Sequence, residues 1–506
     1  MNKKQEEFTR EFTSFIQEQG FIWGPEPEIY GGLAGFYTYG PLGKLLKNKV
    51  ENNIRKVFKA SDFWELEGPT VLPNIVWEAS GHLGNFIDKV VICSKCNKEF
   101  RADKLIEEAT GKSSVHLSDE LMLKEIKKNK ILCPSCDSEF RNEVSKQSLM
   151  MLTRVAGKDA GLRPETATVT YLPFKRYYMF LRKKMPLGVF QIGKAYRNEI
   201  SPRQSVIRGR EFTQAEGQLY VDPIQKNKWE KFEDVKKEKL PLWSYQLQDS
   251  KKDLKPISLG DAIKDKTLKN QAYAWCLHLA YTQFKELGVP EDRIRLRQHH
   301  PDERAFYADD AWDLEINLNS LGWTECCGIH DRTDYDLKQH AKFSKQTLEA
   351  ERENGEKFIP HVLEIAFGTD RPTYALLDLF YEKMEKEEGK TMFKIPYQTA
   401  PIDIAIYPLI KKDELIAKAK KIKKELEDEF IVIYDETGSI GRRYLRSTTY
   451  GIPFCITIDF DAGVTIRDRN TEKQIRVDEG QLKSVIHKLF NREIQFEHAG
   501  KLVNKG

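Results

Sequence analysis

The chain has 506 residues, 40% of them hydrophobic and 31% charged, and its 81 basic and 77 acidic residues leave a net charge of +4. This length exceeds what one compact core organises, so we expect several domains. The near-neutral charge excludes a chain that binds nucleic acid through overall basicity. The sequence has no stretch that approaches 18 apolar residues, so we expect no membrane span. Residues 1–19 lack the apolar core and cleavage site of a signal peptide, so the expected compartment is the cytoplasm.

The first hundred residues predict two amphipathic helices and a strand. Apolar residues from Phe8 to Ile16 recur at helical spacing, and Gly20 is expected to end that helix. A second apolar face predicts a helix over 43–58. Residues 63–75 are expected to form a strand.

Residues 90–142 are interpreted as an insertion that carries two pairs of cysteines. Two C-x-x-C turns, separated by 36 residues, can place four thiolates tetrahedrally around Zn²⁺. Four thiolates leave no open position, so the expected zinc is structural, and four unligated thiols are the alternative. The cysteines are Cys93, Cys96, Cys133 and Cys136.

Two strand-like runs within 186–221 flank a loop rich in Pro, Arg and Gly, which predicts a hairpin. Alternation along the strands brings a guanidinium, an aromatic ring and three carboxyl or amide groups to one face, from Arg197, Glu199, Phe212, Gln214 and Glu216. Arg208, in the loop, can fold over this face. A guanidinium suits phosphate and a ring can stack on a purine, so the hairpin is suited to ATP. A surface hairpin with incidental salt bridges is the alternative.

Residues 225–270 are rich in charge and poor in apolar side chains, and we interpret them as a solvated insertion. A helix is expected over 271–288, and strands over 312–328 and 361–367. The last strand leads into a helix that carries Arg371 at its N-terminus, which is an anion-binding location.

A change of rhythm near residues 394–401 predicts a boundary with few signs of a shared core, followed by a small α/β domain. Within it, Arg442, Arg443 and Tyr444 combine charge and an aromatic ring, a mix that suits phosphate contacts and base stacking. Short basic runs are also common on solvated surfaces.

The pattern Arg197-x-Glu199 followed by Arg208-x-x-x-Phe212 resembles the second signature motif of the class II aminoacyl-tRNA synthetases. The resemblance implies an α+β fold with an antiparallel β-sheet catalytic core flanked by helices. It also implies that Arg197 contacts the α-phosphate of ATP, that Arg208 contacts the γ-phosphate, and that Phe212 stacks on adenine.

Residues 364–372 resemble the third class II motif, whose arginine, here Arg371, binds the γ-phosphate. The helix at 43–58, the strand after it and Pro73 resemble the first motif, which forms the dimer interface in the family, so a homodimer is expected. Residues 400–477 resemble the anticodon-binding domain shared by the synthetases for glycine, threonine, proline and histidine. The implied division is a catalytic domain over 1–393 and an anticodon-binding domain over 394–506.

Runs at 162–167, 322–328 and 332–337 resemble the glycyl-tRNA synthetases in particular. The resemblance implies catalytic roles for Arg197, Glu199 and Arg371. It implies ATP binding with Mg²⁺ by Arg197, Asn198, Glu199, Ile207, Arg208, Phe212, Glu325, Cys326, Gly368 and Arg371. It implies substrate binding by Arg101, Glu165, Phe212, Gln214, Glu216, Glu364, Ala366 and Gly368, with the carboxylates of Glu165, Glu216 and Glu364 around the substrate ammonium.

Two departures from the family pattern lie beside these residues. Ile365-Ala366 stands where many members have Pro-Ser, and Thr168-Val169 stands where many have Gln-Gly. The serine is associated with glycine binding, whereas the ATP motifs are intact. Residues 144–161 match the family poorly.

The reaction implied by the resemblance is that of a glycine–tRNA ligase. Glycine attacks ATP to give glycyl-adenylate and pyrophosphate, and the 3′ end of tRNA(Gly) takes the glycyl group. A small, acidic site suits glycine, and alanine must be excluded sterically. The alternatives are a sister class II synthetase for another small amino acid, and a non-catalytic synthetase-like protein that only binds RNA.

Overall fold

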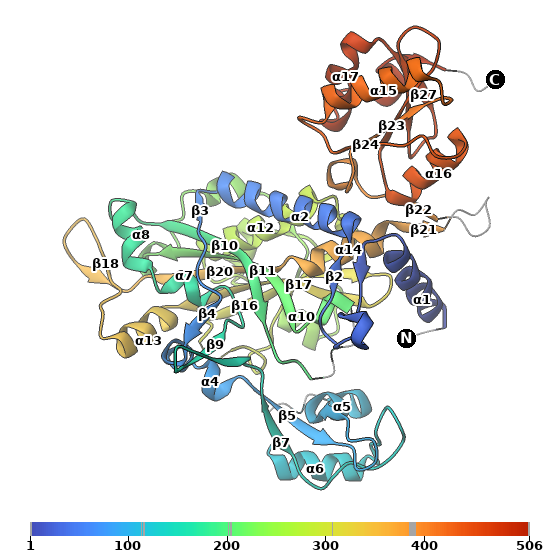
Figure 1. Ribbon diagram of the computed structural model, residues 1–506. Helices are drawn as coiled ribbons and strands as arrows, with labels where there is room; N and C mark the ends of the chain where they lie inside the picture. The colour runs from blue at the N-terminus through green and yellow to red at the C-terminus, as the bar shows by residue number, and fades with distance from the viewer. Residues whose placement is uncertain are drawn as a thin grey trace.

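The computed structural model describes residues 3–112, 114, 117–200, 202, 205–305, 307–383 and 391–503. A central body is built on a large sheet, an insertion lies below it in the view of Figure 1, and a C-terminal domain lies above it. Among the described residues, none of the helices has the length and apolar character that a membrane span requires.

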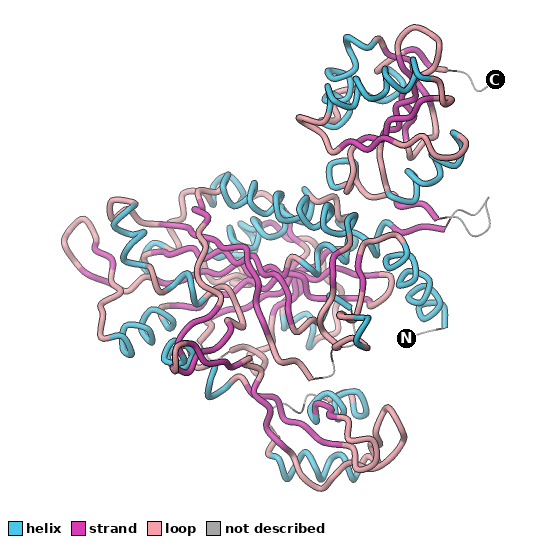
Figure 2. Tube along the Cα trace, viewed as in Figure 1, coloured by secondary structure: helices cyan, strands magenta, loops and turns pink. Residues whose placement is uncertain are grey.

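The large sheet has eight strands in the order β13-β15-β16-β17-β20-β11-β10-β3, gathered in the middle of Figure 2. All neighbours pair antiparallel except the two edge pairs, β13 with β15 and β3 with β10. The bounds are β3 (Phe63–Glu65), β10 (Leu187–Tyr196), β11 (Glu211–Val221), β13 (Leu242–Trp243), β15 (Ile294–Gln298), β16 (Asp310–Leu318), β17 (Gly322–Thr333) and β20 (His361–Gly368). The predicted hairpin is confirmed as β10 and β11.

Three helices cover one face of this sheet, namely α2 (Pro41–Ala60), α12 (Gln271–Glu286) and α14 (Asp370–Phe380). Helix α2 confirms the predicted second helix, and Pro41 begins it at a position where its missing N–H costs nothing. Phe58 of α2 stacks on Phe190 of β10, with ring centroids 4.9 Å apart. Gly217 of β11 allows this approach, because a Cβ there would lie 2.5 Å from the Phe58 ring.

The first predicted helix is confirmed as α1 (Lys3–Glu18). The other elements of the central body are α3 (Asn74–Ala79), α4 (His82–Asn85), α7 (Thr168–Tyr171), α8 (Phe174–Phe180), α13 (Tyr335–Ser344), and the short strands β1 (Ile22–Trp23), β2 (Thr38–Tyr39), β18 (Ala350–Glu351) and β19 (Lys357–Phe358).

The single strand predicted over 63–75 is wrong, because two strands of different sheets occupy it. β3 belongs to the large sheet, whereas β4 (Val71–Pro73) pairs with β9 (Lys158–Leu162), which pairs with β8 (Leu152–Val155). Between β3 and β4, the Gly68 N–H donates to the Gln191 side chain, and Pro69 has no N–H for a ladder. Residues 144–161, which the sequence left unplaced, supply most of this small sheet.

Residues 90–142 were expected to form an insertion, and the structure gives this region a hydrophobic core of its own. Strands β5 (Ile87–Ile92), β6 (Glu99–Arg101) and β7 (Ser145–Ser148) form its sheet, and α5 (Ala102–Thr110) and α6 (Asp119–Lys128) pack beside it. Helix α6 is charged but not wholly exposed, since Met122 and Ile126 are buried.

Residues 225–270 are not a solvated insertion. Their apolar side chains belong to the main core, namely Trp229, Phe232, Val235, Leu240, Leu242, Leu259, Ala262 and Leu268. The elements are α9 (Phe232–Val235), β12 (Lys239–Leu240), α10 (Tyr245–Asp249), β14 (Ile257–Ser258) and α11 (Leu259–Lys264), while β13 extends the large sheet. The average composition suggested solvation because the apolar residues are few, but the spacing of these eight places them in the core.

The C-terminal α/β domain confirms the predicted alternation of strand and helix. Its sheet has the order β24-β23-β25-β26-β27-β28, parallel over the first three strands and antiparallel over the rest. The bounds are β23 (Ile404–Pro408), β24 (Val432–Tyr434), β25 (Phe454–Ile458), β26 (Val464–Asp468), β27 (Gln474–Val477), β28 (Lys501–Leu502), α15 (Asp413–Leu426), α16 (Ile440–Tyr450) and α17 (Leu482–Phe490).

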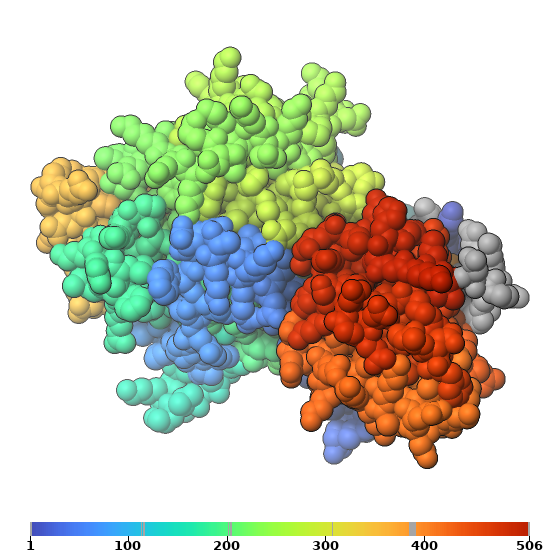
Figure 3. Space-filling model, turned by 90° about the horizontal axis from the view of Figure 1, so that it is seen from above, coloured from blue at the N-terminus to red at the C-terminus, as the bar shows by residue number. Residues whose placement is uncertain are grey.

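The junction between this domain and the central body is packed, which contradicts the expected lack of a shared core. The hairpin of β21 (Tyr381–Lys383) and β22 (Thr391–Phe393) leads into it. Apolar residues on both sides of the predicted boundary belong to the main core, including Phe393, Ile395, Ile402, Tyr407 and Ile452. Lys49 of α2 pairs with Asp403 at 2.8 Å, and Figure 3 shows the C-terminal domain, in orange and red, against the blue segment that contains α2. The alternation of strands and helices in the sequence indicates a new domain, but it does not reveal that one face of this domain packs against the central body.

Gly451→Ala should test this junction. Gly451 has φ +77°, and a Cβ there would lie 2.7 Å from the Phe393 ring. We expect the free energy of unfolding to fall by about 1–2 kcal/mol for the left-handed conformation and by about 1–3 kcal/mol more for overpacking. Denaturant unfolding measures it.

Gly438→Ala is the matched control, because Gly438 has φ +79° and its nearest neighbour, the Arg442 side chain, is 3.7 Å away. Its free energy of unfolding should fall only by the about 1–2 kcal/mol that belongs to the left-handed conformation. Equal losses in the two variants would contradict a tightly packed junction.

Candidate active site

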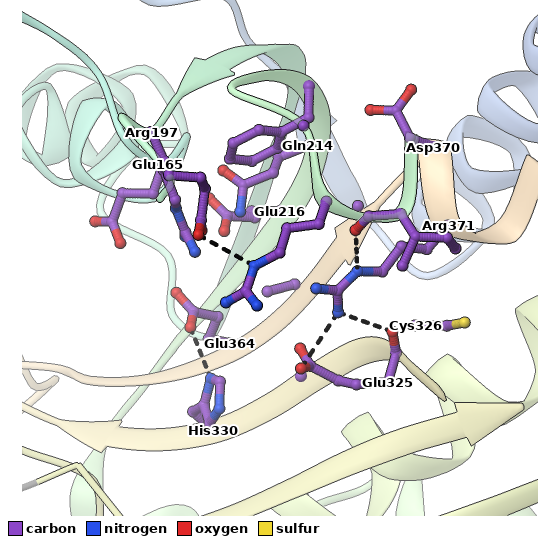
Figure 4. Close-up of a pocket in the computed structure, with 18 of the residues that line it drawn as sticks. Glu165, Arg197, Gln214, Glu216, Glu325, Cys326, His330, Glu364, Asp370 and Arg371 are labelled. Atoms are coloured by element: carbon purple, nitrogen blue, oxygen red, sulfur yellow. Dashed lines mark hydrogen bonds and ion pairs between the residues drawn. The ribbon is translucent and has the colours of Figure 1, made fainter. Parts of the chain in front are cut away.

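A cavity of about 380 Å³ opens over the middle of the large sheet, between the β10–β11 hairpin, β17, β20 and the start of α14 (Figure 4). Its cationic end is lined by Arg197, Glu199, Ile207, Arg208, Phe212, Glu325, Cys326, Gly368 and Arg371. Its acidic end is lined by Glu165, Gln214, Glu216, Glu364 and Ala366. The fold thus brings together residues separated by more than 200 positions in the chain.

The sheet register explains why these side chains share one wall. Phe212, Gln214 and Glu216 alternate along β11, as predicted. Across β11, Gln214 faces Gly368 and Glu216 faces Ala366 of β20, so small residues leave room beside the long polar ones. These cross-strand pairs form the floor of the cavity.

Arg197 and Glu199 lie just beyond the end of β10, not within it as the alternation argument assumed. Arg197 donates its Nε to the Pro164 carbonyl at 3.0 Å, and its guanidinium lies 5.3 Å from the Phe212 ring centroid. Arg208 folds back as expected and donates its Nε to Glu199 Oε2 at 3.1 Å.

Arg371 projects from the first turn of α14 toward β17. It donates to the Glu325 carbonyl at 2.8 Å and pairs with the Glu325 carboxylate at 3.2 Å (Figure 4). The Arg371 guanidinium lowers the pKa of Glu325. The turn is anchored by Asp370, whose carboxylate accepts from buried Lys47 at 2.6 Å and from the Thr213 N–H at 2.7 Å.

At the acidic end, Glu216 is buried, and Thr166 donates to one of its oxygens from both its backbone N–H, at 2.8 Å, and its hydroxyl, at 2.6 Å. Burial, together with the charges of Glu364 and Glu165, raises the pKa of Glu216 to about 8. In the free protein at neutral pH this carboxyl is therefore mostly protonated.

Glu364 and Glu165 are held in the charged form. Although burial opposes it, Arg332 at 3.2 Å and His330 at 2.9 Å lower the pKa of Glu364 to about 2. Glu165, also desolvated, has its pKa lowered chiefly by His82, whose ring nitrogen is 3.5 Å away. The acidic end thus holds two carboxylates and one protonated carboxyl, an arrangement that favours one additional cation.

Sequence reasoning assigned no role to His330, Arg332 and Tyr307, which line this end of the cavity, or to His82, which contacts Glu165 from outside the cavity lining. His330 and Arg332 are two residues apart on β17, and His330 faces Glu364 in the strand register. The Tyr307 ring lies 4.4 Å from the Arg332 guanidinium. Alternation along 328–332 was the signal that could have revealed the two β17 residues.

Two predicted site residues are placed elsewhere. The Asn198 N–H donates to the Leu149 carbonyl at 2.8 Å, and its side chain is not part of the cavity wall among the described residues. Arg101 also lies outside the wall, because Asp103, at 2.7 Å, and Asp88, at 3.3 Å, hold its guanidinium in the insertion. Local ion pairs within the insertion thus compete with the expected contact to substrate.

The four cysteines of the insertion converge, with all their Sγ atoms within 4.8 Å of one another. Cys93 and Cys136 are 3.4 Å apart, and Cys96 and Cys133 are 3.7 Å apart. A tetrahedral zinc with Zn–S bonds of about 2.3 Å separates its sulfurs by about 3.8 Å, so the donor set fits Zn²⁺.

The two C-x-x-C turns have the same backbone. Cys93 and Cys133 each donate an N–H at 2.9 Å to the carbonyl five residues later. The residue after each second cysteine, Asn97 or Asp137, has a positive φ, 56° and 52°. This repeated geometry points both pairs of thiols inward.

The predicted RNA-contacting residues of the C-terminal domain do not share one surface. Arg442 is exposed. Arg443 is only 2% exposed and donates to the Gly438 and Pro408 carbonyls, so it lies in the interior instead. The Tyr444 hydroxyl is engaged with Thr457 at 2.7 Å. These three residues lie on helix α16, which was not predicted, and successive residues of a helix point in different directions. Arg443 therefore points into the domain while Arg442 points to solvent.

Comparison with known proteins finds two protein families that match different parts of the chain. Residues 151–380 match the family described as the tRNA synthetase class II core domain (G, H, P, S and T), and residues 403–489 match the anticodon binding domain. The chain is 39% identical to the glycine–tRNA ligase of Thermococcus gammatolerans, over 94% of this chain and 97% of that protein.

Similar relatives are the glycine–tRNA ligases of Pyrococcus abyssi, 40% identical over 94% of this chain and 96% of that one, and of Methanococcus maripaludis, 37% identical over 91% and 96%. A solved prolyl-tRNA synthetase from Cryptosporidium parvum, complexed with halofuginone and AMPPNP, superposes with a TM-score of 0.58. It covers 97% of this chain and 79% of its own at 14% identity, which is evidence of the shared fold alone.

Glu216→Gln should stabilise the protein increasingly as pH rises. A carboxyl whose pKa rises from 4.5 to about 8 on folding stabilises the folded state at low pH, and this contribution is lost as pH rises through the folded-state pKa. One pKa unit corresponds to about 1.4 kcal/mol, so the gain over wild type should grow by about 3 kcal/mol between pH 5 and pH 8. Denaturant unfolding across this range measures it.

Glu364→Gln is the control of opposite sign, because the pKa of Glu364 is lowered. Its substitution should destabilise the protein at neutral pH. A constant difference between wild type and Glu216→Gln at every pH would contradict the raised pKa.

Proposed function

The chain belongs to the glycine–tRNA ligase family of the class II aminoacyl-tRNA synthetases, and from that premise we propose how its cavity handles ATP and glycine. As an enzyme of this family it activates glycine with ATP and charges tRNA, as the sequence motifs predicted. The observation that carries the assignment of residues is the pairing, in one cavity, of a cationic end with a buried trio of carboxyl groups.

The cationic end suits ATP. We propose that Arg197 contacts the α-phosphate, that Arg208 and Arg371 contact the γ-phosphate, and that adenine stacks on Phe212. In the free protein Arg208 and Arg371 are each paired with a carboxylate, and phosphate oxygens would replace part of that pairing. Mg²⁺ bound with ATP neutralises phosphate charge, and half-exposed Glu325 is the proposed residue that holds it.

The acidic end suits the glycine ammonium. Glu216 would ionise when an ammonium arrives, because the added positive charge offsets the repulsion from Glu165 and Glu364. The glycine carboxylate then faces the α-phosphate and attacks it, forming the new P–O bond as the bond to pyrophosphate breaks. Positioning and charge stabilisation serve this step, with no nucleophile from the protein.

The two departures from the family pattern are accommodated in this arrangement. Ile365 is buried and points away from the cavity, whereas Ala366 lines it without a hydroxyl. Thr168, where many members have Gln, donates its hydroxyl to Glu165 at 2.7 Å. Binding of the ammonium therefore depends on the three carboxyl groups.

The alternatives fit less well. A sister enzyme for another small amino acid does not account for the identity of 39–40% to glycine–tRNA ligases over 94% of the chain. A protein that only binds RNA does not need the intact cationic end. All five predicted ATP-binding side chains of the signature motifs line the cavity, namely Arg197, Glu199, Arg208, Phe212 and Arg371.

We propose that the four cysteines hold one structural Zn²⁺. Four sulfur donors fill a tetrahedral site and leave no position for substrate. The insertion is small and its two C-x-x-C turns are far apart in sequence. A metal bound by both turns would therefore stabilise the folded insertion.

We propose a catalytic domain over 1–393 and an anticodon-binding domain over 394–506 that contacts tRNA(Gly). Arg442 remains a candidate contact, and a second candidate of this domain is Lys412, which lies 4.6 Å over the exposed Phe460 ring. Ring and cation together suit a base and its phosphate. Loss of tRNA binding with rising salt tests this proposal.

We propose a homodimer formed at the β3 edge of the large sheet. Trp64 of β3 and Phe180 of α8 are 55% and 69% exposed, with ring centroids 5.7 Å apart. Large apolar side chains beside an open sheet edge are typical of a protein interface. Sedimentation of wild type against a Trp64→Glu variant tests it.

Glycine should be the amino acid that supports rapid pyrophosphate exchange, and Arg197→Ala should slow that exchange. Loss of one preorganised charge-stabilising donor costs about 2–4 kcal/mol of transition-state free energy. Lys194→Ala is the control, since Lys194 lies on the same hairpin but pairs with Glu211 on the surface. A dominant signal from threonine, proline or serine would refute the glycine assignment, and wild-type exchange in Arg197→Ala would remove the hairpin from the mechanism.

Elemental analysis should find about one zinc per chain, in keeping with a closed four-thiolate site. Cys133→Ser should release it, whereas Cys276→Ser, which changes a buried thiol in α12, should not. Less than about a tenth of an equivalent, in protein never exposed to a strong chelator, would contradict the site.

A further inference from the structure

Strand β17 is irregular beside the acidic end of the cavity. In its pairing with β20, Asp331 faces Leu363 and Thr333 faces Val362, so Arg332 is an extra residue in the register. Thr333 has φ +54°, a left-handed conformation that β-branched residues rarely adopt. Such a bulge re-aims a side chain, and here it accompanies the contact of Arg332 with Glu364, at 3.2 Å.

The bulge is supported by the carboxylate of Asp331, a fully buried residue. One of its oxygens accepts the Thr333 N–H at 3.3 Å, directly after the extra residue. Lys226 Nζ donates to both carboxylate oxygens at 2.7 Å, and Asn270 Nδ2 donates to one at 3.2 Å. Asp331 thus links the backbone of the bulge to two side chains from another part of the chain.

Lys226 and Asn270 come from the two ends of the segment 225–270. Asn270 also caps α12 by accepting the Tyr273 N–H at 2.9 Å, and the Lys226 carbonyl accepts the Ala272 N–H at 3.0 Å. The segment is therefore fastened at both ends to the position that precedes Arg332. The charged segment 225–270 is thus connected to the site through the buried carboxylate of Asp331.

We propose that Lys226 and Asp331 are positioning residues for glycine binding, holding the bulge that keeps Arg332 against Glu364. Neither touches the cavity. Because His330 and Arg332 point into the site, the intervening Asp331 points to the other face of the sheet. Displacing Arg332 would leave Glu364 without its nearest full positive charge and would disturb the carboxyl trio. The cationic end is built on the hairpin, α14 and residues 325 and 326 of β17, which precede the bulge in the strand, so it would be unaffected.

This inference deepens the proposed function and rests on its placement of glycine at the acidic end. It requires a selective effect, because a purely structural role for the pair would lower the amount of folded enzyme or impair both substrates. The separation of the KM for glycine from the KM for ATP decides between them.

The experiment is glycine-dependent pyrophosphate exchange in full-length Lys226→Met, with glycine and ATP titrated separately. Changes in residues that couple to a site without touching its ligand alter binding by about 0.5–2 kcal/mol, so the KM for glycine should rise about two- to thirtyfold. The KM for ATP should stay within about twofold of wild type. Lys231→Met is the matched control, because Lys231 lies in the same segment and pairs with exposed Asp62.

Lys226→Met leaves the Asp331 charge buried without its main partner and can fail to fold. The double variant Lys226→Met/Asp331→Asn removes both charges, and it should fold and show the same selective rise for glycine. A KM for glycine within twofold of wild type in the folded double variant would overturn the proposal, as would equal rises for glycine and ATP.

Failure of the proposed function has a different signature. If wild type exchanged pyrophosphate with an amino acid other than glycine, or if Glu364→Gln kept wild-type glycine kinetics, the acidic end would not be the glycine site. If wild type and Glu364→Gln behaved as expected but the Lys226 variants did not, only the positioning role would fall.

Discussion

The structure depends on one electrostatic constraint, which is that three glutamates must share a single buried end of a cavity. Carboxylates this close cannot all ionise without compensating charge. Glu364 and Glu165 receive it from Arg332, His330 and His82. Glu216 accepts hydrogen bonds from the hydroxyl and backbone N–H of Thr166 and, among the described residues, forms no ion pair. In the free site Glu216 therefore carries a proton. In the proposed binding mode, the substrate ammonium supplies the positive charge that allows Glu216 to ionise.

The fold meets this constraint by combining three strands of the large sheet, which carry Glu216, Glu364 and His330, with Glu165 from the loop between β9 and α7 and His82 from α4. Register places His330, Glu364 and Gln218 in a row across β17, β20 and β11, beside a second row of Gly328, Ala366 and Glu216. Long polar side chains are thus flanked by residues with little or no side chain. A sheet holds such rows rigidly, because each strand is fixed on both sides. The placement of Glu216 and Glu364 therefore follows from backbone pairing. Glu165 is held from outside the sheet by its contacts with Thr168 and His82.

Sequence reasoning reached the parts of this arrangement that lie in local patterns. The alternation of Phe212, Gln214 and Glu216 and the cysteine spacing are visible without knowledge of the fold. Contacts set by tertiary packing were not accessible in the same way. Charge content concealed that 225–270 contributes to the core, and a basic run concealed that helix α16 turns Arg443 inward. Both errors came from averaging over residues whose individual directions decide the result.

Charge balance alone cannot select glycine, since every amino acid brings the same ammonium. Discrimination must come from the space around its α-carbon. In the proposed glycine site the floor is made of Gly328 and Ala366, and a Cβ at Gly328 would lie 2.8 Å from the His330 ring. His330 is in turn fixed by its contact with Glu364 at 2.9 Å. The group that helps to keep Glu364 charged is therefore also a wall of the cavity. Electrostatic recognition and steric exclusion depend on the same side chain, so a change that loosens one loosens the other.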